Sequence, residues 1–168
     1  MFTYPRLELY QSVIPRRYSF TIKASTIHNR LVSTCWVYES WTPEDGSPQP
    51  PRKQYNALWD TGATNSMVTK RVVEDLGLDP EGYSNVFHVG GAAEDVPHYF
   101  VNLVLLTEVH FPSVSVAEGV LLGNDVLIGM DIINRGDFAV SNRDGATSFS
   151  FRIPSVEDFD FAAEDSQL

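Results

Sequence analysis

The chain has 168 residues, a length typical of one domain, and 43% of them are hydrophobic, enough to form a core. It carries 22 acidic residues against 12 Lys and Arg, a formal net charge of −10. Because nucleic-acid binding without sequence preference needs cations that displace phosphate counterions, a chain this acidic is not expected to bind nucleic acid. The single cysteine, Cys35, excludes an intrachain disulfide and a cysteine-based zinc site, and it fits a reducing compartment.

The N-terminal sequence MFTYPRLELYQ has no basic stretch followed by an apolar one, so no signal peptide is expected. No apolar run is long and continuous enough to cross a bilayer. We therefore predict a cytoplasmic protein that does not associate with membranes, with one domain over residues 1–153 and an acidic tail over residues 154–168. That tail contains five acidic residues and no basic one, and we expect it to be mobile or ordered by a partner.

Three strands are predicted in the first third of the chain. Apolar and polar residues alternate over Arg17–Ala24, and Leu31–Tyr38 is rich in β-branched and aromatic residues. Four prolines within Trp41–Pro51 predict an exposed loop rather than regular structure. The third strand, Tyr55–Trp59, follows this loop and runs directly into Asp60.

An amphipathic helix is predicted next, with Ser66 as its N-cap and Gly77 as its stop signal. Its apolar face is formed by Val68, Val72, Val73 and Leu76. The pair Gly90-Gly91 within Phe87–Pro97 then predicts a hairpin. The later elements are strands at Tyr99–Leu106, Val114–Ala117 and Val126–Ile128, a short helical turn at Met130–Asn134, and a hairpin formed by Asp137–Val140 and Thr147–Ile153. Many short strands and one good helix predict an all-β closed sheet or sandwich.

One short motif carries residues suited to catalysis: Asp60-Thr61-Gly62-Ala63, at the end of an apolar strand. A carboxylate in this position is held rigidly while its oxygens face a cleft. The Thr61 hydroxyl can hold the turn, and Gly62 allows a close backbone approach. Taken alone, the tripeptide Asp-Thr-Gly is weak evidence, since it also occurs in ordinary turns.

The order of motifs along the chain is more specific. The chain begins this series with an apolar strand, which is followed by the Asp-Thr-Gly-Ala turn, a helix and a glycine-paired hairpin. The series ends with Val126-Leu127-Ile128-Gly129 and a short helix. This order resembles the retropepsin family, the single-lobe aspartic proteases of retroviruses and their relatives, and most of all bacterial retropepsin-like domains and the protease domain of DNA-damage-inducible proteins. The resemblance covers about Tyr18 to Asn142. It implies an all-β closed barrel with one or two short helices, a flap hairpin and an active site completed only in a dimer.

The resemblance also implies roles for individual residues. Asp60 would be the catalytic carboxylate of an aspartic endopeptidase, supported by Thr61, Gly62 and Ala63. Residues expected to contact the substrate are Thr64, Asn65, Val89, Gly90, Gly91, Leu127, Ile128 and Gly129. Two carboxylates sharing one proton can activate a water that attacks a peptide bond, without a metal or any other cofactor. Since the chain holds one Asp-Thr-Gly only, activity on a peptide or protein substrate would require a homodimer.

Two alternatives stay open at this point: a catalytically weak retropepsin-fold module for peptide binding or dimerisation, and an unrelated small β protein in which the motif is a turn. The four histidines show no metal-ligand spacing, and Cys35 is interpreted as a core residue. The segments Phe2–Ile14 and Thr147–Ile153 are equal candidates for the strands of a dimer sheet. The excess of acidic residues is interpreted as solubility charge rather than as a preference for basic peptides.

Overall fold

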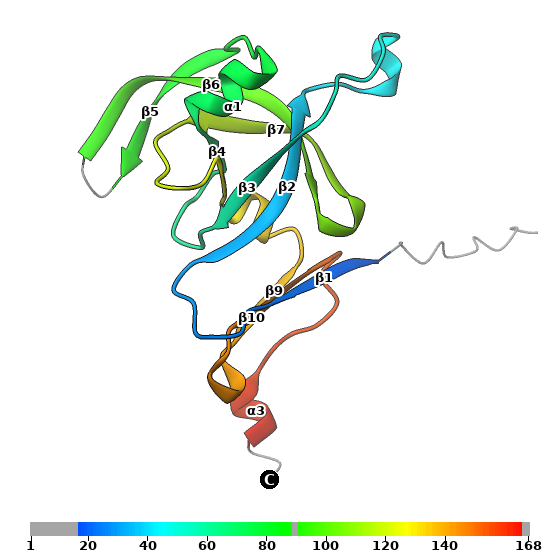
Figure 1. Ribbon diagram of the computed structural model, residues 1–168, viewed down its shortest axis with the longest axis vertical. Helices are drawn as coiled ribbons and strands as arrows, with labels where there is room; N and C mark the ends of the chain where they lie inside the picture. The colour runs from blue at the N-terminus through cyan, green and yellow to red at the C-terminus, as the bar shows by residue number, and fades with distance from the viewer. Residues whose placement is uncertain (1–16, 89–90, 166–168) are drawn as a thin grey trace, which may run out of the picture.

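The structure is a computed structural model that describes residues 17–88 and 91–165 (Figure 1). Its strands are β1 Tyr18–Lys23, β2 Leu31–Glu39, β3 Lys53–Trp59, β4 Met67–Val68, β5 Gly82–His88, β6 Gly91–Leu105, β7 Val109–Glu118, β8 Val126–Ile128, β9 Asp137–Ser141 and β10 Ser148–Ile153. The α-helices are α1 Lys70–Leu76, α2 Met130–Ile133 and α3 Phe161–Asp165, and single 3₁₀ turns occupy Pro43–Asp45, Leu106–Glu108 and Arg143–Gly145. None of the helices in the described ranges is long and apolar enough to cross a membrane.

Six strands form a closed barrel in the order β2-β3-β8-β4-β7-β6, and pairing of β6 with β2 completes the ring. This confirms the all-β closed barrel with short helices. Among the strands of the described residues, β5 pairs with β6 alone, and the two form a long hairpin that projects from the barrel (Figure 1). The predicted glycine-pair hairpin is thereby confirmed, although Val89 and Gly90 themselves lie outside the described residues. The return strand and the strand predicted at Tyr99–Leu106 are in fact one continuous strand, β6.

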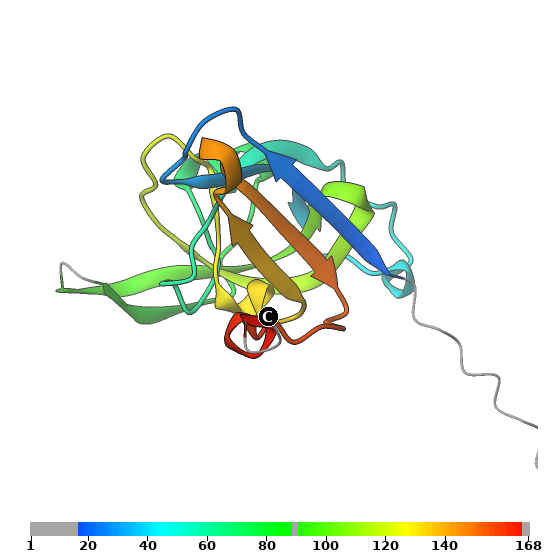
Figure 2. The ribbon, with the colours of Figure 1, turned by 90° about the horizontal axis from the view of Figure 1, so that it is seen from below.

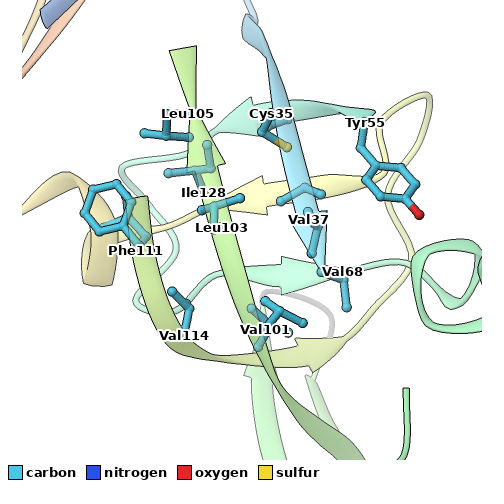
Figure 3. Packing of buried hydrophobic residues seen from close by; sticks show 14 of the residues in the cluster. Cys35, Val37, Tyr55, Val68, Val101, Leu103, Leu105, Phe111, Val114 and Ile128 are labelled. Carbon is cyan, nitrogen blue, oxygen red and sulfur yellow. The ribbon is translucent and has the colours of Figure 1, made fainter. Parts of the chain in front are cut away.

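The barrel is filled by aliphatic and aromatic side chains from all of its long strands (Figure 3). Alternate residues of β2 point inward, and Cys35 and Val37 are fully buried there, as period-two alternation requires. Phe111, Leu105 and Ile128 fill the centre and are also fully buried. Removal of this apolar surface from water is the main stabilising contribution to the barrel.

A second sheet, of order β1-β10-β9, packs below the barrel (Figures 1 and 2). Its inner face is aromatic, and Phe20 on β1 pairs in register with Phe151 on β10. Both rings contact Trp59, the last residue of β3, and the Trp59 ring stacks on Phe138 of β9 with centroids 5.3 Å apart. This terminal sheet therefore packs directly behind the residue that precedes Asp60.

The predicted helix begins later than its apolar pattern suggests. Val68 and the residue before it form β4, which pairs with β7 and β8, and the N-cap of α1 is Thr69. The prediction of Ser66 as N-cap is therefore wrong, because its hydroxyl makes tertiary hydrogen bonds instead. The predicted C-terminus is confirmed, since Gly77 adopts the left-handed conformation with φ of 64°.

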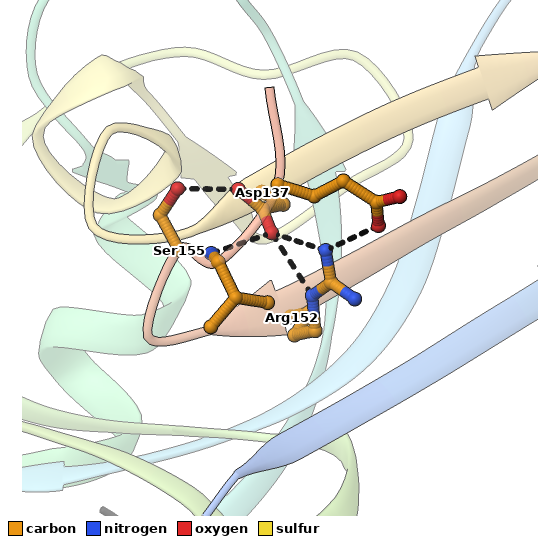
Figure 4. Close-up of polar contacts among 5 residues, drawn as sticks. Asp137, Arg152 and Ser155 are labelled. Carbon is orange, nitrogen blue, oxygen red and sulfur yellow. Dashed lines mark hydrogen bonds and ion pairs between the residues drawn. The ribbon is translucent and has the colours of Figure 1, made fainter. Parts of the chain in front are cut away.

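The segment after β10 differs from the expected mobile tail over its first residues (Figure 4). The carboxylate of Asp137 on β9 accepts hydrogen bonds from the Ser155 hydroxyl and from the Val156 N–H. Arg152 on β10 bridges Asp137 and Glu157, with N···O distances of 2.9 Å from its Nε and 3.0 Å from its terminal nitrogen. Residues 155–157 are thus held against the terminal sheet by the Asp137 carboxylate and the Arg152 guanidinium, both of which lie outside the tail.

Candidate active site

Asp60 directly follows β3, which pairs in parallel with β8. Trp59, the last residue of β3, is in register with Ile128 of β8. The Asp60 N–H donates to the Ile128 carbonyl at 3.0 Å, which extends the parallel ladder by one residue. Its carboxylate accepts a hydrogen bond from the Gly62 N–H at 2.8 Å. The side chain is half-buried, and in the described part of the chain no ion pair involves it. One carboxylate oxygen is therefore fixed by the backbone, while the other is available to a group outside the turn.

The second motif packs against the first through Gly129. A Cβ placed on Gly129 would lie 2.6 Å from the Asn65 carbonyl carbon and 3.0 Å from the Ala63 carbonyl oxygen. The Met130 N–H donates to the Ala63 carbonyl at 2.9 Å, and the Asp131 N–H donates to the Thr64 carbonyl at 3.1 Å. Only glycine permits this approach, so the two motifs form one hydrogen-bonded unit.

Two residues that were not predicted to belong to the site, Ser66 and Asp131, connect these loops. The fully buried Ser66 hydroxyl donates to the Asp131 carboxylate at 2.8 Å and accepts from the Gly129 N–H at 3.1 Å. The same Asp131 oxygen accepts the Ile132 N–H at 3.0 Å within the first turn of α2. Ser66 lies four positions after Gly62, and Asp131 lies two positions after Gly129, so both are close to the two motifs in sequence. Patterns within one sequence do not show that two such distant residues are partners.

Trp59 fixes the strand that carries Asp60. Its indole N–H donates to the Ser33 hydroxyl on β2 at 2.9 Å, within the barrel. Its ring lies 5.2 Å from that of Phe151 and 5.9 Å from that of Phe149, both on β10. Because aromatic packing of this kind is rigid, the backbone at Asp60 is held from both the barrel and the terminal sheet.

The structure brings together the predicted residues of the two motifs, Asp60–Asn65 and Leu127–Gly129. Thr61, Gly62, Thr64 and Asn65 are exposed, Ala63 is half-buried, and Leu127 and Ile128 are buried within β8. Gly91 begins strand β6 of the hairpin and takes no part in the hydrogen bonds described above. Val89 and Gly90 lie outside the described residues, so their predicted contacts with substrate stay predictions.

Cys35 is fully buried in the barrel, in keeping with its interpretation as a core residue. Burial, with a smaller contribution from the negative charge of Asp125, raises the pKa of the Cys35 thiol to about 12. A thiol is nucleophilic as the thiolate, which this environment disfavours at neutral pH. Cys35 is therefore not expected to act as a nucleophile in the folded chain.

A sequence profile of the family described as "gag-polyprotein putative aspartyl protease" matches residues 52–135, half of the chain. The chain belongs to this family. The match runs from β3 through α2 and thus includes both motifs of the candidate site. The interpretation of the Asp-Thr-Gly motif as a turn in an unrelated β protein is therefore wrong. No curated protein matches the chain.

Among solved structures, the chain is similar to a retropepsin-like aspartic protease from Rickettsia conorii. The TM-score is 0.54 at 14% identity, and the alignment covers 82% of this chain and 95% of the other. It also aligns with an EIAV protease in complex with the inhibitor HBY-793, with a TM-score of 0.45 at 19% identity over 65% of this chain and 92% of that one. A retroviral protease-like domain of Ddi1 from Leishmania major aligns with a TM-score of 0.40 at 20% identity, over 66% of this chain and 79% of that one. The first similarity supports the retropepsin-like fold of this member of the family.

Proposed function

We propose that the chain is an aspartic endopeptidase whose active form is a homodimer with one Asp60 from each subunit on the two-fold axis. The observation that carries the proposal is the geometry of the Asp60 turn. The Gly62 N–H holds one carboxylate oxygen, and the Gly129 loop fixes the backbone beneath it. A single such carboxylate lacks the second acid that this chemistry requires, and the chain contains one Asp-Thr-Gly only.

The proposed chemistry follows from two carboxylates at close range. Two negative charges in one site are costly, so the pair retains one proton. The ionised member accepts a proton from a water, which attacks the carbonyl carbon of the peptide. The protonated member donates to the developing oxyanion, and a proton then passes to the leaving amine. Neither a metal nor a covalent intermediate takes part.

The surrounding elements have matching proposed roles. The β5–β6 hairpin would act as a flap that closes over the substrate and excludes water, as lids do in other enzymes. Leu127 and Ile128, together with Thr64 and Asn65, would contact the substrate beside the carboxylates. Thr61 is exposed, which suits the role proposed for its hydroxyl, a contact with the second subunit.

The structure reduces the number of segments that can form the dimer sheet. Strand β10 pairs with β1 along one edge and with β9 along the other, so no edge of β10 is open to a partner strand. The candidate Thr147–Ile153 is therefore excluded as a site of edge pairing, and Phe2–Ile14 lies outside the described residues. The outer edges of β1 and β9 carry no strand in the described part of the chain, and we propose one of them as the dimer edge.

A subunit-mixing experiment tests the proposal. Wild-type chain is mixed with Asp60→Asn chain at constant total concentration, allowed to exchange subunits, and assayed on denatured casein. If both carboxylates are needed, activity follows the square of the wild-type fraction, so an equal mixture retains about one quarter. A linear dependence would contradict the shared site. No cleavage by the wild-type chain at concentrations where it sediments as a dimer would favour the binding or dimerisation module instead.

A further inference from the structure

A pocket of about 520 Å³ opens between the terminal sheet and the barrel. Its apolar part is formed by Ile22 of β1, Leu31 and Val32 of β2, and Phe149 of β10. Three basic residues, Lys23, His28 and Arg30, line it from β1 and the loop that follows. The other described residues that line it are neutral, and no Asp or Glu is among them.

The absence of acidic residues from this lining is unexpected in a chain with 22 acids and 12 Lys or Arg. All three basic side chains belong to exposed residues. Among the described residues, none of the three forms an ion pair with a carboxylate, whereas Arg52, Arg71 and Arg152 each do. The pocket is therefore a local concentration of positive charge on an acidic protein, and charge of one sign in a concave site attracts the opposite sign.

Arg30 is positioned by neutral acceptors. Its guanidinium donates to the Leu122 carbonyl at 2.8 Å. The buried Asn124 amide lies beside the same Arg30 nitrogen, and the orientation that turns its oxygen toward Arg30 would let it accept from the guanidinium and donate its own N–H to the Gly123 carbonyl. Carbonyl and amide oxygens orient the guanidinium without neutralising its charge. Its Nε–H and Nη1–H donors stay available, and each can donate one charge-assisted hydrogen bond to a carboxylate oxygen.

The pocket adjoins both strands that hold Asp60. Leu31 pairs in register with Trp59, the residue before Asp60. Gly123 and Asn124 lie just before β8, whose Ile128 carbonyl accepts the Asp60 N–H. The same loop presents two strongly exposed apolar side chains, Val120 at 92% and Leu122 at 85% exposure. Positive charge beside exposed apolar groups fits a peptide with acidic and hydrophobic side chains better than an inorganic anion.

We infer that this pocket binds the carboxylate of an acidic side chain in a peptide, with Arg30 as its main ligand, Lys23 as a supporting cation and His28 as a further polar contact. That the bound peptide is a substrate rests on the proposed function. Under that function, the pocket gives the protease a preference for acidic residues near the cleavage site. The inference differs from the interpretation of the charge pattern as solubility charge alone, because the positive residues converge on one pocket.

Direct binding tests the inference without cleavage. The probe is a fluorescein-labelled peptide with the sequence of residues 156–165, VEDFDFAAED, which combines acidic and aromatic residues. The matched control peptide, VQNFNFAAQN, replaces each acid by its amide. Fluorescence anisotropy with the full Asp60→Asn chain is expected to show at least about tenfold tighter binding of the acidic peptide, weakening as NaCl is raised. Equal affinities for the two peptides would overturn the inference.

Substitutions locate the binding. In the Asp60→Asn background, Arg30→Gln with Lys23→Gln is expected to reduce the affinity for the acidic peptide to that for the amide peptide. Arg30→Lys should retain an intermediate affinity, and Lys70→Gln on the exposed face of α1 should have no effect. If Arg30→Gln lowers the thermal midpoint so far that the chain unfolds, the double variant Lys23→Gln with His28→Gln is tested in its place. We expect its affinity for the acidic peptide to be at least about threefold lower than that of the parent Asp60→Asn chain. Undiminished binding by a folded variant would refute the site.

Cleavage assays separate this inference from the proposed function. The substrates are two casein-derived peptides that differ only in whether their acidic residues are replaced by the amides. If the wild-type chain cleaves both at equal kcat/KM, the pocket does not determine specificity, but the proposed protease activity stands. Arg30-dependent binding of the acidic peptide by a chain that cleaves nothing would support the pocket and refute the protease.

Discussion

The hydroxyl of Ser66 and the carboxylate of Asp131 meet at 2.8 Å between the two loops of the candidate site. This contact joins the turn that carries Asp60 to the helix that follows Gly129. Since the Ser66 oxygen also accepts the Gly129 N–H, one buried side chain satisfies groups on both sides of the junction. The geometry of Asp60 thus depends on a residue that does not contact it.

Replacement of this hydroxyl is the first prediction. Ser66→Ala leaves the Gly129 N–H and one Asp131 oxygen without their buried partner, and we expect the free energy of unfolding to fall by about 1–3 kcal/mol. Peptide cleavage is expected to fall more than stability alone explains when measured well below the unfolding midpoint. Urea unfolding checks the first effect. Ser115→Ala, at an exposed position of β7, is the matched control and should change neither quantity.

The close approach at Gly129 gives a second prediction. In Gly129→Ala the new methyl group meets the Asn65 backbone at 2.6 Å and cannot be accommodated by rotation of a side chain. The loop must move, so we expect loss of cleavage together with destabilisation of more than about 2 kcal/mol. Gly82→Ala is the control, because a Cβ at Gly82 has no heavy atom within 4 Å. A Gly129→Ala chain as stable and active as wild type would refute the proposed tight junction.

The Asp137 carboxylate predicts a pH dependence of stability. Hydrogen bonds from Ser155 and from the Val156 N–H, together with Arg152, lower the pKa of Asp137 to about 2. A group whose pKa is lower in the folded than in the unfolded chain, where it is about 3.9, stabilises the fold above that value and loses this effect as the pH falls.

Thermal melts of wild-type and Asp137→Asn chains between pH 6 and pH 2 measure this effect. The wild-type chain should melt at the higher temperature near pH 6, and the difference should shrink between about pH 4 and pH 2. Asp144→Asn, at an exposed turn, should show no such convergence. A difference between wild type and Asp137→Asn that stays constant over this range would contradict the role given to the carboxylate.

Cys35 offers a test of the barrel itself. Its thiol is fully buried and its pKa is raised to about 12, so the native chain should not react with Ellman's reagent at pH 8. Full reaction is expected in guanidinium chloride. Rapid labelling of the folded chain would show that β2 opens readily and is not a continuous wall of the barrel.

The elements that could be predicted from sequence are those whose signal is local. Alternation identified β1, and the content of β-branched and aromatic residues identified β2. The Gly90-Gly91 pair identified the hairpin, and Gly77 correctly marked the C-terminus of α1. The order of the motifs, which resembles that of the retropepsin family, predicted the closed barrel. These features depend on residue periodicity, turn chemistry and the spacing of short motifs.

The features that were missed depend on contacts distant in sequence. Ser66 has the local signature of an N-cap, but its partner Asp131 lies 65 positions away. The two residues of β4 are too few to show alternation, and they are held in place by β7 and β8. The basic pocket is similarly invisible, since Lys23 and Arg30 become neighbours of Asn124 only in the fold. Such pairings decide which of several locally reasonable roles a residue takes.

The terminal sheet also sets an order of assembly. The aromatic rings that contact Trp59 include Phe149 and Phe151 of β10. Among the described strands, β1 pairs with β10 alone, so this pairing cannot form until β10 has been synthesised. During synthesis, the segment that carries Asp60 leaves the ribosome long before those strands do. The carboxylate therefore receives its final support only after residue 153 has emerged, and a nascent chain lacks the finished site.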